Sequence, residues 1–285
     1  MSAIGSLAPW FGGKRTMSAT IAAAIGPHRS YWEPFCGSMA VLLGKPAVSS
    51  ETVNDLHSDL TNLARVIQHP TLGAAFYRRL RRTLFSEGLF RDSREVILSP
   101  TAGASPDVDR ACHYFIYSWM GLNGTAGTAA TNGNFCRRFS SSGGDAGIRF
   151  LSAVGSIPAW RKRLERVVIL QSDGIELCER IEDREGTAIY CDPPYLVKGA
   201  KYVHDFASED HSRLALTLRR FEKTRVVVSY YDHPRLADLY PGWRVLRLDV
   251  TKGMVNSGKR GESGATKAPE ILLVNQIDPV TQFLF

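Results

Sequence analysis

The stretch AIYCDPPY, at residues 188–195, joins a short apolar run to a rigid turn. Residues 188–191 are typical of a buried strand, and the two prolines that follow fix their own φ angles and remove two backbone N–H donors. The carbonyl groups of Asp192 and Pro193 can therefore face outward as unpaired acceptors, beside a carboxylate and an aromatic ring. An amino group on a planar aromatic ring fits this arrangement. The alternative interpretation is an ordinary strand end with a capping aspartate.

A second stretch, YWEPFCGSMAVLL at residues 31–43, is typical of a strand, a tight Gly-Ser turn and the first turns of a helix. A single glycine with a small neighbour lets a ligand approach the backbone closely. The stretch lacks the three glycines of the dinucleotide fingerprint and the elements of a P-loop, which argues against hydride transfer and nucleotide hydrolysis. Eighteen residues past Gly37, after a predicted strand near 48–53, Asp55 stands where α/β folds bind a ribose diol. Its alternative role is a helix cap.

Near the amino terminus, PWFGGKR at residues 9–15 places two aromatic and two cationic side chains around a Gly-Gly pair. With the stretches above, it resembles the Dam-like, alpha-group N6-adenine-specific DNA methyltransferases. Their motifs run in the order aromatic-x-Gly-Gly-Lys, Glu-Pro-Phe-x-Gly-Ser, acidic ribose binder, target-recognition region and Asp-Pro-Pro-Tyr, and the same order holds here. The resemblance covers residues 9–275, loosely in the middle third, and Phe11 stands where the family often has a smaller residue.

This resemblance implies an enzyme that moves a methyl group from S-adenosylmethionine to the N6 amine of a flipped-out adenine, because an amine inside a duplex cannot be reached. The Asp192 carboxylate and the Pro193 carbonyl would accept the two amine hydrogens. The implied catalytic residues are Asp192, Pro193, Pro194 and Tyr195, with Tyr195 stacking on the base. The resemblance also implies the cofactor-binding residues. Trp10 and Lys14 would close over the methionine and adenosyl portions of the cofactor, and Glu33, Phe35 and Gly37 would face its methionine. Asp55 would bind its ribose, Ser172 and Asp173 would contact its adenine, and Asp192 would touch both the cofactor and the target base.

Two other interpretations stay open at this point. A catalytically silent DNA-binding relative could keep the fold, although the intact tetrapeptide at 192–195 argues against it. Alternatively, the enzyme could act on cytosine N4 or on RNA, because a similar tetrapeptide serves those amines. An aspartate in the first position, rather than serine or asparagine, favours adenine by resemblance.

Positive charge gathers in the middle of the chain. Residues 76–166 hold 14 Arg and Lys against 7 Asp and Glu, whereas the remainder holds 21 of each sign. The spacing of Phe76, Leu80 and Leu84 predicts one apolar helix face. Single charged helix faces are usually only solvated, but a localised basic segment suits binding to phosphates. The basic residues in question are Arg78, Arg79, Arg81, Arg82, Arg137, Arg138, Arg161, Lys162, Arg163 and Arg166.

The stretch 121–144 is long, rich in Gly, Asn and Ser, and poor in apolar periodicity. Loops of this length inside a compact domain are usually functional, so we predict a recognition loop or hairpin here. Its Asn123, Arg137 and Arg138 are the predicted DNA-binding residues. A second Gly- and Lys-rich loop, 252–267, is expected to be mobile without its ligand.

Strands are predicted near 31–35, 48–53, 167–170, 187–191, 225–231, 244–250 and 270–275, with helices between them. This alternation predicts an α/β fold, a doubly wound Rossmann-like methyltransferase sheet with an inserted, mostly helical target-recognition lobe. Residues 1–68 and 167–285 would form the catalytic and cofactor domain. Residues 69–166 would form the target-recognition, DNA-binding insertion.

The 285-residue chain is 44% hydrophobic and has no apolar run long enough to span a bilayer, which predicts a soluble globular protein. No signal peptide is visible. Five scattered cysteines without a Cys-x-x-Cys pair indicate neither a zinc site nor a disulfide framework. We therefore expect a cytoplasmic, prokaryotic or phage-encoded protein that acts on double-stranded DNA as a monomer, without a metal and without membrane contact.

Overall fold

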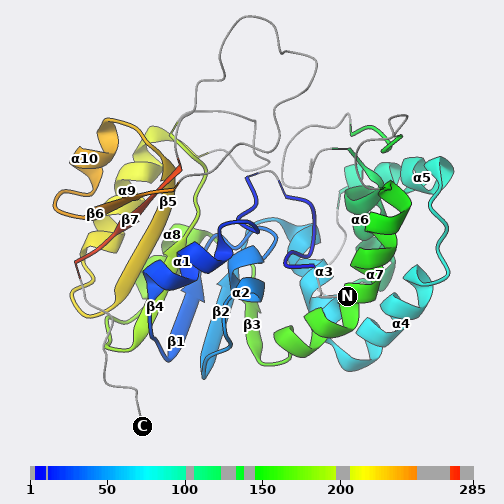
Figure 1. Ribbon diagram of the computed structural model, residues 1–285, viewed down its shortest axis with the longest axis horizontal. Helices are drawn as coiled ribbons and strands as arrows, with labels where there is room; N and C mark the ends of the chain where they lie inside the picture. The colour runs from blue at the N-terminus through cyan, green and yellow to red at the C-terminus, as the bar shows by residue number, and fades with distance from the viewer. Residues whose placement is uncertain are drawn as a thin grey trace, which may run out of the picture.

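A sheet of seven strands forms the centre of the computed structural model, which describes residues 4–10, 12–100, 106–122, 133–137, 145–196, 206–248 and 270–276 (Figure 1). Its order within these residues is β3-β2-β1-β4-β5-β7-β6. The first five strands are parallel, and β7 runs antiparallel to β5 and β6. The strands are β1 (Ser30–Glu33), β2 (Ser50–Asn54), β3 (Val167–Leu170), β4 (Thr187–Cys191), β5 (Arg225–Tyr231), β6 (Arg244–Arg247) and β7 (Glu270–Val274). All seven predicted strands are therefore confirmed.

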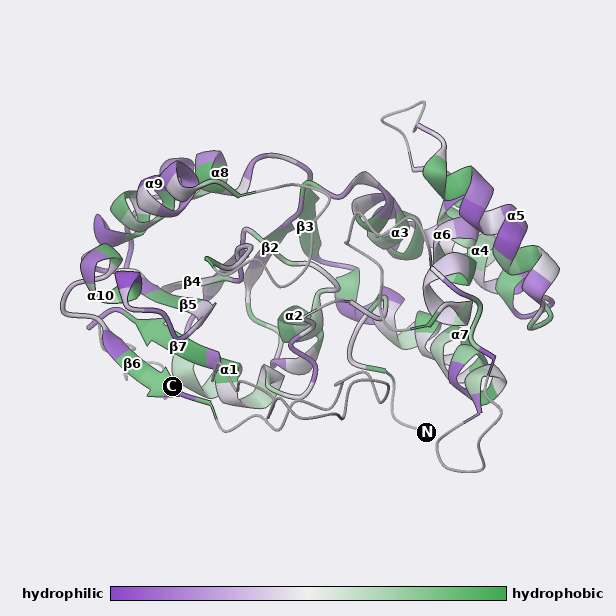
Figure 2. Ribbon diagram, turned by 90° about the horizontal axis from the view of Figure 1, so that it is seen from above, coloured by the Kyte–Doolittle hydropathy of each residue, from purple (hydrophilic) through white to green (hydrophobic). Residues whose placement is uncertain are grey.

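Helices cover both faces of this sheet, as the view from above shows (Figure 2). α1 and α2 lie on one face, and α8 and α9 lie on the other. The helices are α1 (Ser18–Ile25), α2 (Ala40–Gly44), α3 (Ser58–Gln68), α4 (Pro70–Leu80), α5 (Glu87–Leu98), α6 (Val108–Met120), α7 (Ala146–Leu164), α8 (Gly174–Arg180), α9 (Ser208–Arg219) and α10 (Arg235–Leu239). The predicted doubly wound α/β class is confirmed.

Two apolar cores follow from this layering. Along β4, Ala188 and Tyr190 belong to the core on one face, and Ile189 and Cys191 belong to the core on the other. Successive strand residues point to opposite faces, so a strand that is covered on both sides is apolar throughout. This is why residues 188–191 carry no polar alternation.

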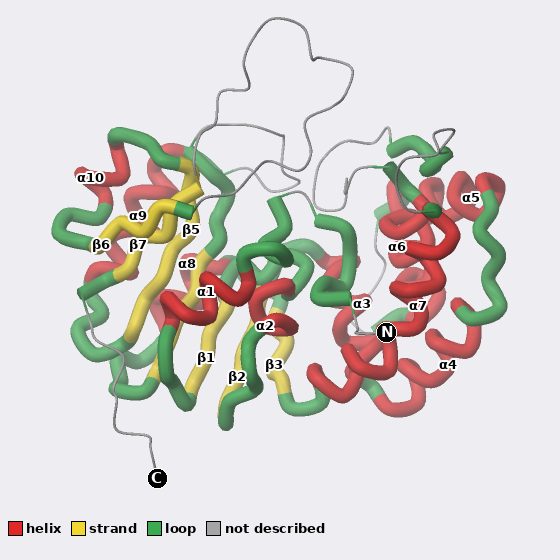
Figure 3. The backbone as a smooth tube through the Cα atoms, in the orientation of Figure 1, coloured by secondary structure: helices red, strands yellow, loops and turns green. Residues whose placement is uncertain are grey.

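Helices α4 to α7 form a helical lobe beside β3 (Figure 3). Its interior is aromatic, with the ring of Phe115 packed against Phe76, Phe150 and Trp160. This interior is continuous with the sheet core that contains Ala188 and Tyr190, because α3 packs on both α6 and α7. The proposed division into domains at 68/69 and 166/167 stays a prediction.

The predicted helix face of Phe76, Leu80 and Leu84 is only partly correct. Phe76 and Leu80 are fully buried in α4, but the helix ends at Leu80 and Leu84 is 77% exposed. Leu84 lies beyond the helix, so the i, i+4 spacing no longer directs it to the core.

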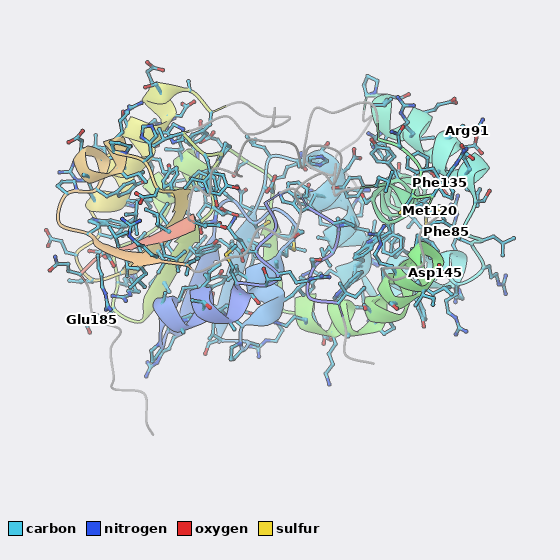
Figure 4. The ribbon with its side chains drawn as sticks, turned by 45° about the horizontal axis from the view of Figure 1, so that its top comes forward. Phe85, Arg91, Met120, Phe135, Asp145 and Glu185 are labelled. Atoms are coloured by element: carbon cyan, nitrogen blue, oxygen red, sulfur yellow. The ribbon has the colours of Figure 1, made fainter. Side chains whose placement is uncertain are left out.

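Two described parts of the predicted recognition loop, residues 121–122 and 133–137, lie together in the helical lobe. Gly121 and Phe135 form an antiparallel bridge, and Leu122 N–H donates to the Asn134 carbonyl at 2.8 Å. The Phe135 ring packs on Phe85 at 5.0 Å between centroids. Figure 4 shows Phe85, Phe135 and Met120 in the same part of the lobe, with Arg91 at its outer surface. Residues 123–132 and 138–144 of the predicted loop, like 252–267, lie outside the described part of the chain, so the recognition loop or hairpin stays a prediction.

The basic end of α7 lies at the edge of the sheet opposite Asp192. Arg161, Lys162, Arg163 and Arg166 immediately precede or begin the turn into β3, so they lie where the parallel strands start, at the edge opposite Asp192. Arg163 is also an internal residue, because its guanidinium pairs with Glu51 of β2 and donates to the Leu42 carbonyl. Arg163 is therefore not a free surface cation, and phosphate binding by Arg161, Lys162 and Arg166 stays a prediction.

Among the described residues, no helix is long and apolar enough to cross a membrane. In the same residues, no group of His, Cys, Asp and Glu side chains is placed to hold a metal ion.

Candidate active site

Most of the predicted site residues meet at one edge of the sheet, at the top of Figure 1. Because β1 to β5 are parallel, their last residues share this edge, and the order of strands reverses between β1 and β4. Ligands of open α/β sheets bind at such a reversal. β7 runs the other way, so its first residue, Glu270, reaches the same edge. The edge thus carries Glu33, Asp55, Ser172, Asp192 and Glu270.

The Asp192 carboxylate is bonded on both of its oxygens. Lys14 Nζ lies 2.7 Å from Oδ2, and the Tyr195 hydroxyl lies 3.1 Å from Oδ1. Lys14 and Tyr195 both reach Glu270 Oε1 as well, at 3.1 and 2.6 Å. The four side chains therefore form a closed ring of two carboxylates, an ammonium and a phenol, which we call the Lys14 cluster.

Burial sets the protonation of the Lys14 cluster. It raises the pKa of Asp192 to about 6; the Lys14 ammonium opposes this rise and the Glu270 carboxylate adds to it. Burial also disfavours the Lys14 ammonium, yet Asp192 and Glu270 together hold the pKa of Lys14 above its usual range. The lysine is therefore charged at neutral pH, and Asp192 is mostly ionised but close to titration.

Glu33 ends β1 beside this cluster and is 2% exposed. It accepts a hydrogen bond of 3.0 Å from the Tyr31 hydroxyl. Burial raises the pKa of Glu33 to about 8, against the opposing effect of that hydrogen bond. A buried, protonated carboxyl of this kind gains most from a cationic ligand, which stabilises its ionised form.

The loop from β1 into α2 follows the predicted Gly-Ser turn. Gly37 has φ of 44° and Met39 has φ of 58°, so the backbone turns tightly before the helix. The turn directs Gly37 N–H to Asp55 Oδ2 at 2.8 Å. Trp10 packs on the turn: a Cβ at Gly37 would lie 2.8 Å from its indole nitrogen. The amino-terminal motif and the second motif are therefore in direct contact.

Asp55 braces this loop rather than the helix that follows. Its second oxygen accepts from His57 N–H at 2.9 Å. The residue that caps α3 is His57, whose Nδ1 accepts from Leu60 N–H. The helix-cap alternative for Asp55 is wrong, and its role at a ribose stays a prediction.

Phe35 and Asp173 both lie at the start of α8. The Phe35 ring is so close that a Cβ at Gly174 would lie 2.6 Å from it. Asp173 caps the helix, because its Oδ1 accepts from the N–H groups of Ile175 and Glu176. Phe35 therefore packs on the first turn of α8, and its predicted place facing the methionine stays a prediction.

Sequence reasoning missed Asn54, which joins three loops. Its side-chain amide donates to the carbonyls of Pro34 and Ser172 at 2.9 Å each, and its oxygen accepts from the N–H and hydroxyl of Ser172. It thereby holds Ser172 next to Asp55. The signal was a polar residue at the end of a buried strand.

Sequence reasoning also missed the part that Glu270 plays at the site. An acidic residue at the start of an apolar strand was visible, but its place at this edge depends on β7 being antiparallel.

The predicted DNA-binding residues are only partly described. The guanidinium of Arg137 pairs with Glu87 at the start of α5, on the exposed surface of the helical lobe. Asn123 and Arg138 lie outside the described residues. Their contacts with DNA stay predictions.

Comparison with known proteins gives one family. The family model described as D12 class N6 adenine-specific DNA methyltransferase matches residues 10–254. No curated protein matches the sequence. Two solved structures of the rRNA methyltransferase aviRa from Streptomyces viridochromogenes are similar, at 13% and 12% identity with TM-scores of 0.41 and 0.42. Both alignments cover 92% of this chain and 82% of the other.

Proposed function

Because the chain belongs to the D12 class N6 adenine-specific DNA methyltransferase family, we propose that the adenine amine is methylated at the Lys14 cluster. The family gives the reaction: this enzyme transfers a methyl group from S-adenosylmethionine to N6 of adenine in DNA. The observation that carries the assignment of the site is the Asp192 carboxylate, held by Lys14 and Tyr195 at the strand reversal.

The chemistry needs acceptors, because the lone pair of the adenine amine is delocalised into the ring. The Asp192 carboxylate and the Pro193 carbonyl would each accept one amine hydrogen and so direct the lone pair towards the methyl group. Among the described residues, none donates a hydrogen bond to the Pro193 carbonyl, so it is available as an acceptor. Asp192 and Pro193 would thus align the adenine amine and stabilise it electrostatically during methyl transfer.

Tyr195 is the proposed stacking face for an adenine extruded from the duplex. Its ring is braced by Tyr231, at 4.5 Å in an edge contact, and by Tyr230 at 5.8 Å. Its hydroxyl is fixed by the two carboxylates. A ring held from its edge and its tip offers a rigid surface, and unstacking the base costs a few kcal/mol.

The residues fit the cofactor that the family uses. S-adenosylmethionine supplies an activated methyl group on a sulfonium and carries an ammonium, so it is cationic where it reacts. Two carboxyls with raised pKa values suit such a ligand, the buried Glu33 and the partly exposed Asp192. We assign Glu33 to the ammonium and Asp55, which follows β2, to the ribose. Trp10, which already packs on Gly37, would cover them.

Cofactor affinity should rise by about tenfold per pH unit between roughly pH 5.5 and 7.5, since one unit of pKa corresponds to about 1.4 kcal/mol. In the free protein the pKa of Glu33 is about 8, so the carboxyl is protonated at neutral pH. Pairing with an ammonium requires the ionised form, so binding releases a proton and weakens as the pH falls. Calorimetric titration over this pH range, in buffers of different ionisation enthalpy, measures the cofactor affinity and the number of protons released on binding.

Two variants distinguish the contribution of Glu33 to the pH dependence from that of Asp192. Glu33→Gln should bind weakly with an affinity that is independent of pH, whereas Asp192→Asn should keep the slope. An unchanged wild-type affinity across the range, or proton uptake on binding, would remove Glu33 from the ammonium site.

DNA binding by the helical lobe is the second part of the proposal. Each phosphate contact should add about −0.9 to the slope of log affinity against log salt concentration. Replacing Arg137 and Arg138 together by alanine should flatten this slope by about two units if both reach phosphates. If one reads a guanine edge instead, discrimination between sites should fall by about 1–3 kcal/mol. Fluorescence anisotropy with duplex DNA over a salt series measures the slope.

The matched control removes two charges from the same lobe at its other end. Arg161→Ala with Lys162→Ala should leave the slope unchanged, because these residues lie at the edge opposite Asp192. If the Arg137 and Arg138 pair behaves like this control in affinity, slope and site preference, its stretch is only a solvated surface.

A transfer assay tests the proposed substrate. The purified enzyme with labelled S-adenosylmethionine and unmethylated duplex DNA should give label in N6-methyldeoxyadenosine after nucleoside digestion. Label in N4-methylcytosine, or transfer to RNA alone, would contradict it. We further propose a cytoplasmic monomer of prokaryotic or phage origin that needs no metal.

A further inference from the structure

The Tyr195 hydroxyl has one hydrogen and two carboxylates within reach. Its oxygen is 2.6 Å from Glu270 Oε1 and 3.1 Å from Asp192 Oδ1. A phenol donates a single hydrogen bond at a time, and the shorter contact receives it. In this geometry the shorter hydrogen bond is to Glu270, so the tyrosine stays held when Asp192 Oδ1, the weaker of its two acceptors, turns to a substrate amine.

The Lys14 ammonium has three hydrogens and three acceptors. Its Nζ lies 2.7 Å from Asp192 Oδ2, 3.1 Å from Glu270 Oε1 and 2.8 Å from the Gly12 carbonyl. The side chain is 5% exposed, so no hydrogen is left for water. If Asp192 turns towards a substrate amine, Glu270 and Gly12 still provide two acceptors for the buried charge.

We propose that Glu270 is a positioning residue for methyl transfer: it holds the Tyr195 hydroxyl and the Lys14 ammonium, so that the Asp192 carboxylate is free to accept the adenine amine. This rests on the proposed role of Asp192. Both groups that occupy Asp192 in the free enzyme are shared with Glu270, so the entering amine displaces contacts without leaving a buried charge unpaired. An unpaired buried charge would carry a large desolvation penalty.

Charge supports the same assignment. Glu270 is 11% exposed, and with it the Lys14 cluster holds two carboxylates against one ammonium. Without the Glu270 charge, Lys14 would neutralise Asp192 alone and compete with the amine for it. The charges that act on Asp192 are those of Lys14 in the amino-terminal segment and Glu270 of β7. The Asp192 charge in turn raises the pKa values of the other titratable groups around it, which are Glu33 of β1, Tyr190 and Cys191 of β4, Tyr195, and Tyr230 and Tyr231 of β5.

Glu270→Gln tests this assignment through kcat and its pH profile, measured at saturating cofactor on unmethylated duplex DNA. The variant should lower kcat by about tenfold to 100-fold, the range expected when a reacting group is misplaced. In the free protein the pKa of Asp192 is about 6, and the Glu270 charge contributes to raising it. Loss of that charge should lower the pKa of Asp192, so the acid limb of the variant should lie at lower pH than that of the wild type. The affinity for S-adenosylmethionine should change little.

Three further variants complete the experiment. Glu270→Asp keeps the charge, so it should keep the acid limb in place and have a higher kcat than Glu270→Gln. If Glu270→Gln does not fold, Glu270→Asp still tests whether the position of this carboxylate affects kcat. Glu179→Gln removes a carboxylate from the exposed pair with Arg213 and should behave as the wild type. Asp192→Asn should be inactive.

The outcomes are distinguishable. An inactive Asp192→Asn with a Glu270→Gln that keeps wild-type kcat and acid limb overturns only the role of Glu270. An active Asp192→Asn overturns the proposed mechanism itself. A lower kcat in Glu270→Gln with an unmoved acid limb would assign Glu270 a purely structural role and would also overturn the inference.

Discussion

Asp192→Ala should lower kcat by at least about 10²- to 10³-fold, the loss seen when one preorganised group that stabilises a transition state is removed. The carboxylate accepts an amine hydrogen in our mechanism, and in this variant Glu270 becomes the carboxylate partner of both Tyr195 and Lys14. Single-turnover methylation of duplex DNA at saturating cofactor measures the rate of this step.

The folded protein should survive that substitution. Lys14 keeps Glu270 and the Gly12 carbonyl as partners, so its buried charge is not left unpaired. Circular dichroism and thermal melting check this, with Glu179→Ala as a control for the loss of a carboxylate away from the site. Activity of Asp192→Ala within threefold of the wild type would exclude the carboxylate from the chemistry.

Asp55→Ala should weaken the binding of S-adenosylmethionine by about 1.5–3 kcal/mol, the range for a hydrogen bond to a charged group. Two effects act together: the ribose loses its acceptor, and Gly37 N–H loses the bond that fixes the loop. Calorimetric titration measures the affinity.

Asp55→Asn separates these effects. Its amide oxygen can still accept from Gly37 N–H, so the loop should stay in place while the charged acceptor is lost. We expect an intermediate affinity for this variant. If both variants bind the cofactor as the wild type does, Asp55 serves only to brace the loop.

The strands and their polar ends were predictable because the signals are local. β4 is apolar since both of its faces are covered, and the residues after parallel strands share one edge. The Gly-Ser turn was also local, and its positive φ at Gly37 agrees with the choice of glycine.

The errors concern contacts between distant parts of the chain. Arg163 was counted with the surface charges, but Glu51 of β2, 112 residues away in sequence, binds it internally. Glu270 had no predicted role, because its neighbours Lys14 and Tyr195 come from segments that only the sheet brings together. Leu84 kept the helical spacing past the end of α4, where spacing no longer fixes direction.

The central claim is that this chain methylates adenine N6 in DNA by means of Asp192. Long-read modification sequencing of DNA from a methylation-free host tests it most directly, comparing cells that express the wild type with cells that express Asp192→Ala. We predict N6-methyladenine at one recurring sequence in the first DNA and none in the second. Methylation of cytosine N4, no modified base with the wild type, or the same adenine pattern with both proteins would contradict the account.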